Sequence, residues 1–478
     1  MTHSSFQDLN LSPMDEYNKT LVGHVHPLDW ENPKPKEVYD LVVIGAGTAG
    51  LVTAKGAAGL DVGLNVALIE KHLIGGDCLN VGCVPSKAVI RSSRAVADIE
   101  KGKAYGVHAK GPIEVDFAAV MQRMRKVRAQ ISPVDSALGA KKYGVDMFLG
   151  AGTFTGPDTI QVNGQTLRFK KAVITTGARA VRPQIEGMQE AGYLTNETVF
   201  NLTEQPRRLA VIGGGPIGCE LAQSFRRLGS EVVLFERANH VLIREDADAA
   251  EIVQQSFIEE GMQLVLSAKL QRVEKTAAGK VIHYTSGDGP AQTVVVDEIL
   301  VGAGRAPNVD GLNLEAVGVE YDARKGVKVN DYLQTTNPKI YAAGDICMNW
   351  KFTHAADAAA RIVLKNTLFS PFGFGRYKLS DLVMPWVTYT DPEIAHVGMY
   401  DHDAQAQGLD VNTIKIPFHD VDRAIAEGEE EGFVKIMHKK GSDEILGATI
   451  VASHAGEMIS EITTAIVNKS ADFLIASA

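Results

Sequence analysis

Two cysteines stand close together in the segment GGDCLNVGCVPSK, residues 75–87, although the whole chain of 478 residues holds only four. Cys78 and Cys83 could form half of a zinc site, two buried thiols or a redox-active disulfide. A C-x4-C spacing is loose for zinc, and no second pair of Cys or His lies nearby in the sequence. The glycines around the pair do not favour buried structural thiols. The pair therefore favours disulfide redox chemistry, and we predict no metal site.

The spacing of these cysteines also constrains the local backbone. In an ideal helix, positions i and i+5 have Cα atoms roughly 8–9 Å apart, whereas a disulfide needs less than about 7 Å. We therefore expect a distorted helix start, and Gly82 and Pro85 are suited to such a distortion. A strained, accessible disulfide is readily reduced.

A glycine turn precedes the cysteines, at Gly45, Gly47 and Gly50, between an apolar strand and an expected helix. The first two glycines permit a tight turn and the approach of a pyrophosphate, and the third lets the helix pack on the strand. Glu70 ends the following strand, where an acid can bind a ribose diol. This unit predicts a dinucleotide site.

The same unit recurs at Gly213, Gly215 and Gly218, with Glu236 at the end of its second strand. Glu236 favours NADH, because a carboxylate repels the additional phosphate of NADPH. Arg237 follows directly and could hold that phosphate, so NADPH stays possible. Two such units predict an α/β fold with two Rossmann-like dinucleotide-binding domains.

The remaining sequence adds an arm at the start and a different texture at the end. Residues 1–37 are polar and contain prolines, which predicts an extended arm, and from about residue 380 the pattern indicates an α+β domain with antiparallel strands. The net charge of −10 argues against a nucleic-acid partner. No apolar run approaches the roughly 18 residues of a membrane span. Without a recognisable targeting segment, and with few cysteines, we expect a cytoplasmic protein.

The cysteine segment between two dinucleotide units resembles that of the flavin-dependent pyridine nucleotide–disulfide oxidoreductases, the family of dihydrolipoamide dehydrogenase, glutathione reductase and mercuric reductase. The resemblance covers about residues 38–469. It implies a homodimer with FAD in the first unit and NADH or NADPH in the second. Cys78 is then the interchange thiol that meets the substrate, and Cys83 the charge-transfer thiol against the flavin. Lys87 would lie beside flavin N5, paired with Glu220.

The resemblance extends to further residues around the flavin. Asp345 in IYAAGDI would bind the ribityl or pyrophosphate part of FAD, and Gly177 in VITTGA lies where the chain leaves the first FAD segment. His354, at the start of the helix in FTHAADAAA, would contact the flavin or else be a capping or core histidine. Cys219 and Cys347 stand alone and are expected to be small buried residues.

The resemblance also implies domain boundaries. They are an N-terminal arm (1–37), the FAD-binding domain in two segments (38–185 and 305–379), the NAD(P)H-binding domain (186–304), and a C-terminal α+β dimerisation domain (380–478), which looks truncated.

The substrate follows by elimination within the family. Mercuric reductases and the large thioredoxin reductases carry C-terminal cysteine pairs, and no cysteine follows Cys347. Glutathione reductase would prefer arginines to Glu236. We therefore expect dihydrolipoamide dehydrogenase-like exchange with a small dithiol or disulfide. The alternatives are a diaphorase that reduces quinones or metal ions, as in mercuric reductase, and a catalytically weakened flavoprotein with a binding role.

The end of the sequence lacks a feature that the family has. In the family a histidine and a glutamate follow the last helix and serve the interchange thiol as acid and base, whereas here no histidine follows His454. A positioned acid or base contributes about 10²- to 10⁴-fold in rate. We therefore expect slow dithiol exchange and better-preserved diaphorase activity.

Overall fold

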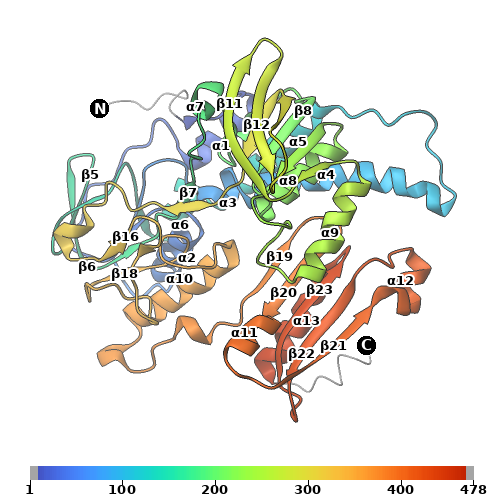
Figure 1. Ribbon diagram of the computed structural model, residues 1–478. Helices are drawn as coiled ribbons and strands as arrows, with labels where there is room; N and C mark the ends of the chain where they lie inside the picture. Colours follow the sequence, from blue (N-terminus) through green and yellow to red (C-terminus); the bar gives the residue numbers. More distant parts are fainter. Residues whose placement is uncertain (1–8, 470–478) are drawn as a thin grey trace.

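The computed structural model describes residues 9–469, which form three groups of elements, each on its own main sheet (Figure 1). The first group contains a sheet of seven strands in the order β3-β2-β1-β6-β5-β4, with β18 pairing to β6. Strand β1 (Tyr39–Ile44) runs parallel to β2 (Val66–Glu70) and to β6 (Gln165–Ile174), and α2 (Thr48–Ala58) packs against α10 (Thr353–Leu368). The other strands are β3 (Val145–Leu149), β4 (Thr153–Gly156), β5 (Thr159–Val162) and β18 (Ile340–Ala342).

The second group repeats the strand–turn–helix–strand unit. Strand β8 (Arg208–Ile212) is parallel to β9 (Glu231–Phe235), and α8 (Pro216–Arg227) connects them. The two predicted units are therefore confirmed as parallel β-α-β units. The sheet order is β10-β9-β8-β14, and a separate antiparallel sheet has the order β11-β12-β13. The remaining elements are β10 (Gln263–Val265), β14 (Glu298–Val301), β11 (Ala268–Thr276), β12 (Gly279–Ser286), β13 (Gln292–Val296), α7 (Met188–Ala191) and α9 (Ala247–Glu259).

The C-terminal group, drawn in orange to red in Figure 1, is a five-stranded antiparallel sheet in the order β19-β20-β23-β22-β21. Helix α13 (Ala455–Asn468) packs on its central strands and shares a buried core with them. The mixed α+β texture is thus confirmed. The elements are β19 (Pro385–Thr388), β20 (Glu393–Gly398), β21 (Val411–Pro417), β22 (Phe433–Lys439), β23 (Ile445–Ala452), α11 (Asp401–Ala406) and α12 (Asp422–Glu427).

Short helices and strands connect these groups. Strands β7 (Ala178–Ala180) and β15 (Arg305–Pro307) pair where the chain leaves and re-enters the first group. The others are β16 (Tyr321–Asp322), β17 (Gly326–Val327), and the 3-10 turns η2 (Gly102–Tyr105), η3 (Val199–Asn201), η4 (Leu314–Val317), η5 (Pro371–Gly373), η6 (Leu379–Asp381) and η7 (Phe418–Asp420). Within residues 9–469, no helix is long and apolar enough to cross a membrane.

The expectation of an extended N-terminal arm is wrong. Residues 16–25 form helix α1 (Glu16–Val25), with Asp15 as N-cap accepting a hydrogen bond from the Asn18 backbone. Leu21, Val22 and Val25 are fully buried, so tertiary packing stabilises this short helix despite its polar composition. It packs on α5 (Phe117–Ile131) and α6 (Ala137–Lys142).

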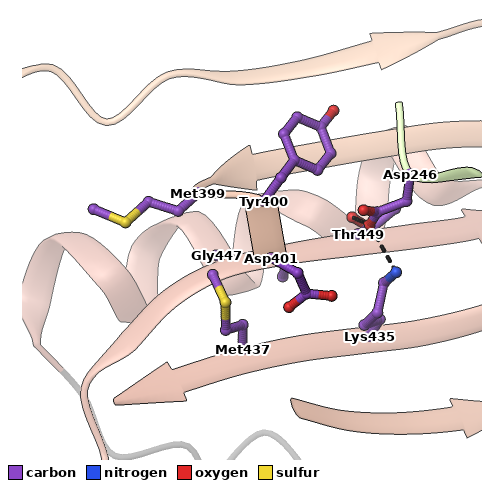
Figure 2. A pocket seen from close by; sticks show the side chains of 9 residues that line it. Asp246, Met399, Tyr400, Asp401, Lys435, Met437, Gly447 and Thr449 are labelled. Atoms are coloured by element: carbon purple, nitrogen blue, oxygen red, sulfur yellow. Dashed lines mark hydrogen bonds and ion pairs between the residues drawn. The ribbon is translucent and has the colours of Figure 1, made fainter. Parts of the chain in front are cut away.

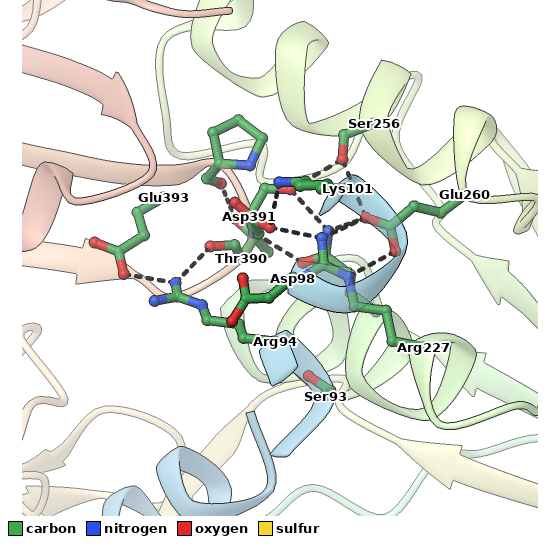
Figure 3. Close-up of polar contacts among 12 residues, drawn as sticks. Ser93, Arg94, Asp98, Lys101, Arg227, Ser256, Glu260, Thr390, Asp391 and Glu393 are labelled. Atoms are coloured by element: carbon green, nitrogen blue, oxygen red, sulfur yellow. Dashed lines mark hydrogen bonds and ion pairs between the residues drawn. The ribbon is translucent and has the colours of Figure 1, made fainter. Parts of the chain in front are cut away.

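A polar junction joins the three groups beside the long helix α4 (Cys83–Lys101) (Figure 3). Arg94 donates to Glu393 at 2.6 Å, which ties α4 to the C-terminal sheet. Arg227 donates to Glu260 at 2.7 Å and to Asp391 at 2.8 Å, which ties the second group to the same sheet. Because these ion pairs are mostly buried, they fix how the C-terminal sheet sits against α4.

Candidate functional site

The helix containing the two cysteines is interrupted between them. Helix α3 (Gly76–Asn80) ends after Cys78, and α4 begins at Cys83 with Gly82 as its N-cap. This break agrees with the expected distortion, and Pro85 lies in the first turn of α4, where a missing N–H costs nothing. Cys83 therefore lies at the positive end of a 19-residue helix, which stabilises a thiolate.

The two thiols, both free in this structure, differ in acidity. A hydrogen bond from the Cys78 thiol lowers the pKa of Cys83 to about 6, and the Thr353 hydroxyl and the charge of Lys87 act in the same direction against burial. The Thr353 hydroxyl lies 3.2 Å from the Cys83 sulfur. The same shared proton raises the pKa of Cys78, and burial adds to this. At neutral pH the pair therefore holds one proton, on Cys78.

A lysine–glutamate pair adjoins the thiols, one turn further along α4. Lys87 Nζ lies 2.9 Å from Glu220 Oε2, as the resemblance implied, and 4.4 Å from the centre of the Tyr389 ring. The other oxygen of Glu220 accepts the backbone N–H of Tyr389 at 2.9 Å. Glu220 is buried in α8, so three separate groups of elements fix the ammonium position.

The first glycine turn has the shape that a pyrophosphate requires. Gly45 has φ +103°, and a Cβ on Gly50 would lie 1.8 Å from the Gly45 carbonyl oxygen. Helix α2 begins at Thr48, and its N-cap Gly47 supplies no side-chain cap, which leaves the first N–H groups of the helix available to a ligand. The buried Glu70 accepts the N–H of Ala46 at 2.7 Å, and burial raises the pKa of Glu70. These features fit the dinucleotide part of FAD.

The second glycine turn repeats this construction. Gly213 has φ +109°, and a Cβ on Gly218 would lie 1.9 Å from the Gly213 oxygen. Helix α8 begins at Pro216, and its N-cap Gly215 supplies no side-chain cap. Glu236 accepts the Gly214 N–H at 2.6 Å. The free N–H groups at the start of α8 and the Glu236 carboxylate fit the pyrophosphate and the ribose of a pyridine nucleotide, as the first turn fits those of FAD.

The cysteine segment rests directly on the first glycine turn. A Cβ on Gly76 would lie 2.7 Å from the Gly47 Cα, and Gly75 donates its N–H to the Ala46 carbonyl at 2.8 Å. Cys78 therefore lies two residues after Gly76, whose backbone contacts the expected pyrophosphate site.

Asp345 follows β18 and forms an ion pair that the sequence did not indicate. Arg305 Nε donates to Asp345 at 3.2 Å, and the same guanidinium pairs with Asp77, next to Cys78. Burial raises the pKa of Asp345, and Arg305 opposes this. Gly177 has φ +66°, and its carbonyl accepts the Asn308 N–H at 2.9 Å. This hydrogen bond joins the segment by which the chain leaves the first group to the segment by which it re-enters it.

The remaining predicted residues lie as follows. His354 is exposed, and its Nε2 lies 2.6 Å from the Pro385 carbonyl, so it is not a core histidine. Arg237 is exposed beside Glu236. Cys219 is fully buried, whereas Cys347 is only partly so. Burial raises the pKa of both thiols, which disfavours their thiolate forms.

The sequence did not reveal four residues that the structure places around the thiols and the lysine. They are Thr353, Tyr389, Arg305 and Asp77. Thr353 is 270 positions from Cys83, and Tyr389 is 169 positions from Glu220. The one sequence signal for any of them was that Thr353 is the first residue of the helix that the resemblance places against the flavin.

A small pocket between the second group and the C-terminal sheet contains none of the predicted site residues (Figure 2). Asp246 pairs with Lys435 at 2.8 Å across it and accepts the Thr449 hydroxyl at 2.8 Å. Asp246 and Lys435 thus compensate each other across the pocket, and we interpret it as a joint between the second group and the C-terminal sheet.

Comparison with known proteins agrees with this geometry. The family model for pyridine nucleotide-disulphide oxidoreductases matches residues 39–360, and the model for their dimerisation domain matches residues 384–476. A mercuric reductase of Lysinibacillus sphaericus is 35% identical over 90% of this chain and 77% of its own length. A dihydrolipoyl dehydrogenase of Chlamydia muridarum is 34% identical over 91% of both chains.

Solved structures give the same result. The HOCl-induced flavoprotein disulfide reductase RclA of Escherichia coli superposes with a TM-score of 0.77 at 27% identity, covering 90% of this chain and 94% of its own. LpdA of Mycobacterium tuberculosis gives 0.79 at 28% identity, covering 90% and 93%. The chain belongs to the pyridine nucleotide-disulphide oxidoreductase family.

Proposed function

We propose that this chain exchanges electrons between NADH and a small dithiol or disulfide through Cys78 and Cys83, in the manner of dihydrolipoamide dehydrogenase. Family membership makes it an oxidoreductase that acts on a sulfur group and uses FAD and a pyridine nucleotide. Bound FAD supplies the two-electron relay between the nucleotide and the disulfide. The observation that carries the proposal is the placement of Cys83 at the N-terminus of α4, with the Thr353 hydroxyl 3.2 Å from its sulfur and the Lys87–Glu220 pair one turn away.

The acidities assign a role to each sulfur. In thiol–disulfide exchange, the sulfur with the lower pKa leaves faster. When a substrate thiolate attacks Cys78, the Cys78–Cys83 bond breaks and Cys83 leaves as a thiolate, whose pKa the Thr353 hydroxyl and the charge of Lys87 lower. A second substrate thiolate then attacks the mixed disulfide, and Cys78 leaves and takes up a proton. Cys83 is the more exposed residue, but its sulfur lies 3.2 Å from the Thr353 hydroxyl, at the helix start that the resemblance places against the isoalloxazine.

Lys87 and Glu220 have a positioning and electrostatic role in the proposal. An ammonium group held near a site of developing negative charge stabilises that charge without reorganisation. Glu220 and the face of the Tyr389 ring hold Lys87 in place, and the Lys87 charge also favours the Cys83 thiolate. In the proposal, Asp345 and Gly177 line the FAD site, and His354 lies near the isoalloxazine end.

We propose NADH as the preferred nucleotide. The Glu236 carboxylate is held at the end of β9 by the N–H groups of Gly214 and Ala238, at 2.6 and 2.8 Å. From there it can accept both hydroxyls of an adenine ribose and would repel a 2′-phosphate. Arg237 is exposed and could partly offset that repulsion.

We propose a cytoplasmic homodimer with the domain boundaries predicted from the sequence, in which the N-terminal segment contains helix α1 and is not an extended arm. The match to the family's dimerisation domain supports the dimer. Met458 and Val467 on α13 support it too, because they are 38% and 61% exposed and would be covered by a partner. The expected absence of the family's C-terminal histidine and glutamate concerns residues 470–478, which lie outside the described part of the chain.

A second candidate is the reduction of metal ions, favoured by the 35% identity to a mercuric reductase. Anaerobic turnover with NADH should be measured with lipoamide, with a quinone and with Hg(II). A lipoamide rate that is lost in both Cys78→Ser and Cys83→Ser, with the quinone rate retained, supports the proposal. A Hg(II) rate above the lipoamide rate in the unmodified protein would select the second candidate instead.

A further inference from the structure

The N-terminal helix α1 lies outside the family model, which begins at residue 39, yet it packs against the cysteine segment. Its buried side chains, Leu21, Val22 and Val25, belong to the same core cluster as Leu73, Ile74 and Leu79, which flank Cys78. The backbone also joins the two segments, because the Ile74 N–H donates to the Val25 carbonyl at 3.0 Å. Residues 9–26, here called the N-terminal strap, thus lie before the residues that the family model matches and contact the cysteine segment.

A buried arginine links the strap to the loop between the cysteines. Arg128, on α5, donates through one nitrogen to the Asn18 side-chain oxygen and through another to the Asn80 carbonyl, both at 2.6 Å. Asn18, Arg128 and Asn80 are each at most 2% exposed. The Asn80 amide donates in turn to the carbonyls of Ile74 and Gly76, at 3.0 and 2.8 Å. The loop between Cys78 and Cys83 is therefore held from the side of the strap.

The strap fixes Asn18 before it meets the arginine. The Asn18 amide nitrogen donates to the Pro13 carbonyl at 2.7 Å, which orients its oxygen toward Arg128. Asp15 accepts from Arg125 at 2.6 Å, which anchors the start of the helix. The Arg128 Nε has no partner among the described residues, so Asn18 provides one of only two acceptors for this buried cation there. Losing that acceptor leaves the guanidinium half-satisfied.

We propose that the strap holds the two thiols close together, with Asn18 and Arg128 as positioning residues that stabilise the Cys78–Cys83 disulfide. Oxidation of the two thiols forms one S–S bond and releases two electrons and two protons. NAD⁺ takes up the two electrons and one proton as a hydride through the family reaction, and the second proton passes to the solvent. In the disulfide the covalent bond itself closes the loop. In the dithiol only the surrounding contacts hold the loop. These contacts therefore set the effective concentration at which each thiol meets the other, and with it how readily the disulfide forms. The inference rests on the proposed redox role of the pair.

The test is the midpoint potential of the pair in the FAD-loaded protein. The protein is equilibrated with mixtures of oxidised and reduced dithiothreitol, quenched with acid and alkylated, and the peptides of Cys78 and Cys83 are quantified by mass spectrometry. In Asn18→Ala we expect disulfide formation to be about tenfold less favourable, a midpoint less negative by about 30 mV. Asn18→Asp, which keeps an acceptor for Arg128, should return the midpoint toward the original value.

Lys19→Ala is the matched control, because Lys19 is exposed on the same helix and should leave the midpoint unchanged. If Asn18→Ala does not fold, Asn18→Ser carries the same expectation, since its shorter side chain does not reach Arg128. A shift below about 10 mV, twofold in the equilibrium constant, or a shift toward more negative values overturns the inference. An equal shift in Asn18→Asp overturns it too. If the unmodified protein forms no Cys78–Cys83 disulfide in any mixture, the proposed function itself fails.

Discussion

Replacing Thr353 with valine should make the Cys83 thiol less acidic. The Thr353 hydroxyl lies 3.2 Å from the Cys83 sulfur and is one of the groups that lower its pKa, after the hydrogen bond from Cys78. A hydrogen bond to a charged group contributes about 1.5–3 kcal/mol, and sulfur is a weak acceptor, so we take about 1.5 kcal/mol. At about 1.36 kcal/mol per unit, the pKa should rise by about one unit, from about 6 to about 7.

The assay is the rate of alkylation of Cys83 by iodoacetamide in the reduced protein as a function of pH, followed on the Cys83 peptide by mass spectrometry. The thiolate reacts and the thiol does not. At pH 6 the rate in Thr353→Val should fall about fivefold, because the thiolate fraction falls from about one half to about one tenth. At pH 8 the two proteins should react almost equally. Thr353→Ser keeps the hydroxyl and serves as the control.

Two results would refute this reasoning. A pH profile of Thr353→Val that superposes on that of the unmodified protein would show that the hydroxyl does not stabilise the thiolate. A shift in Thr353→Ser as large as that in Thr353→Val would show that the shift does not come from loss of the hydroxyl, because serine keeps it.

Three further predictions concern the nucleotide and the lysine pair. Gly218→Ala should weaken NADH binding by more than about tenfold while FAD is retained, because its Cβ would meet the Gly213 oxygen at 1.9 Å; an unchanged dissociation constant in NADH titration argues against the site. Glu236→Arg should lower the ratio of kcat/KM for NADH over NADPH by about tenfold or more, since it exchanges repulsion for attraction of the 2′-phosphate; an unmoved ratio contradicts the proposed ribose contact. Glu220→Gln should slow NADH turnover about tenfold with every acceptor by loosening Lys87, in steady-state assays; a loss confined to lipoamide would place Glu220 in dithiol exchange alone.

The sequence sufficed for the parts of the fold that depend on local pattern. The parallel units around Gly45 and Gly213 were predictable because strand, glycine turn and helix follow one another directly in the sequence. In the structure both glycines have the positive φ that glycine adopts at little cost. The helix break between Cys78 and Cys83 followed from the reach of a disulfide alone. Local rules of this kind act within a few residues.

The parts that were missed depend on assembly of distant segments. Helix α1 was expected to be extended because its sequence is polar, although Asp15 is a good N-cap and Leu21, Val22 and Val25 could share one face. Its stability comes from burial against α5 and α6, more than ninety positions away. Tyr389 meets Lys87 only because the C-terminal sheet packs against α4, and no local pattern indicates that contact.

The central claim is that electrons from NADH reach the Cys78–Cys83 disulfide. The most direct measurement is alkylation of the air-oxidised, FAD-loaded protein before and after anaerobic addition of NADH, with each cysteine peptide quantified by mass spectrometry. We predict that Cys78 and Cys83 are protected before NADH and labelled after it, while the buried Cys219 stays unlabelled in both samples. Equal labelling of Cys78 and Cys83 with and without NADH would contradict the account.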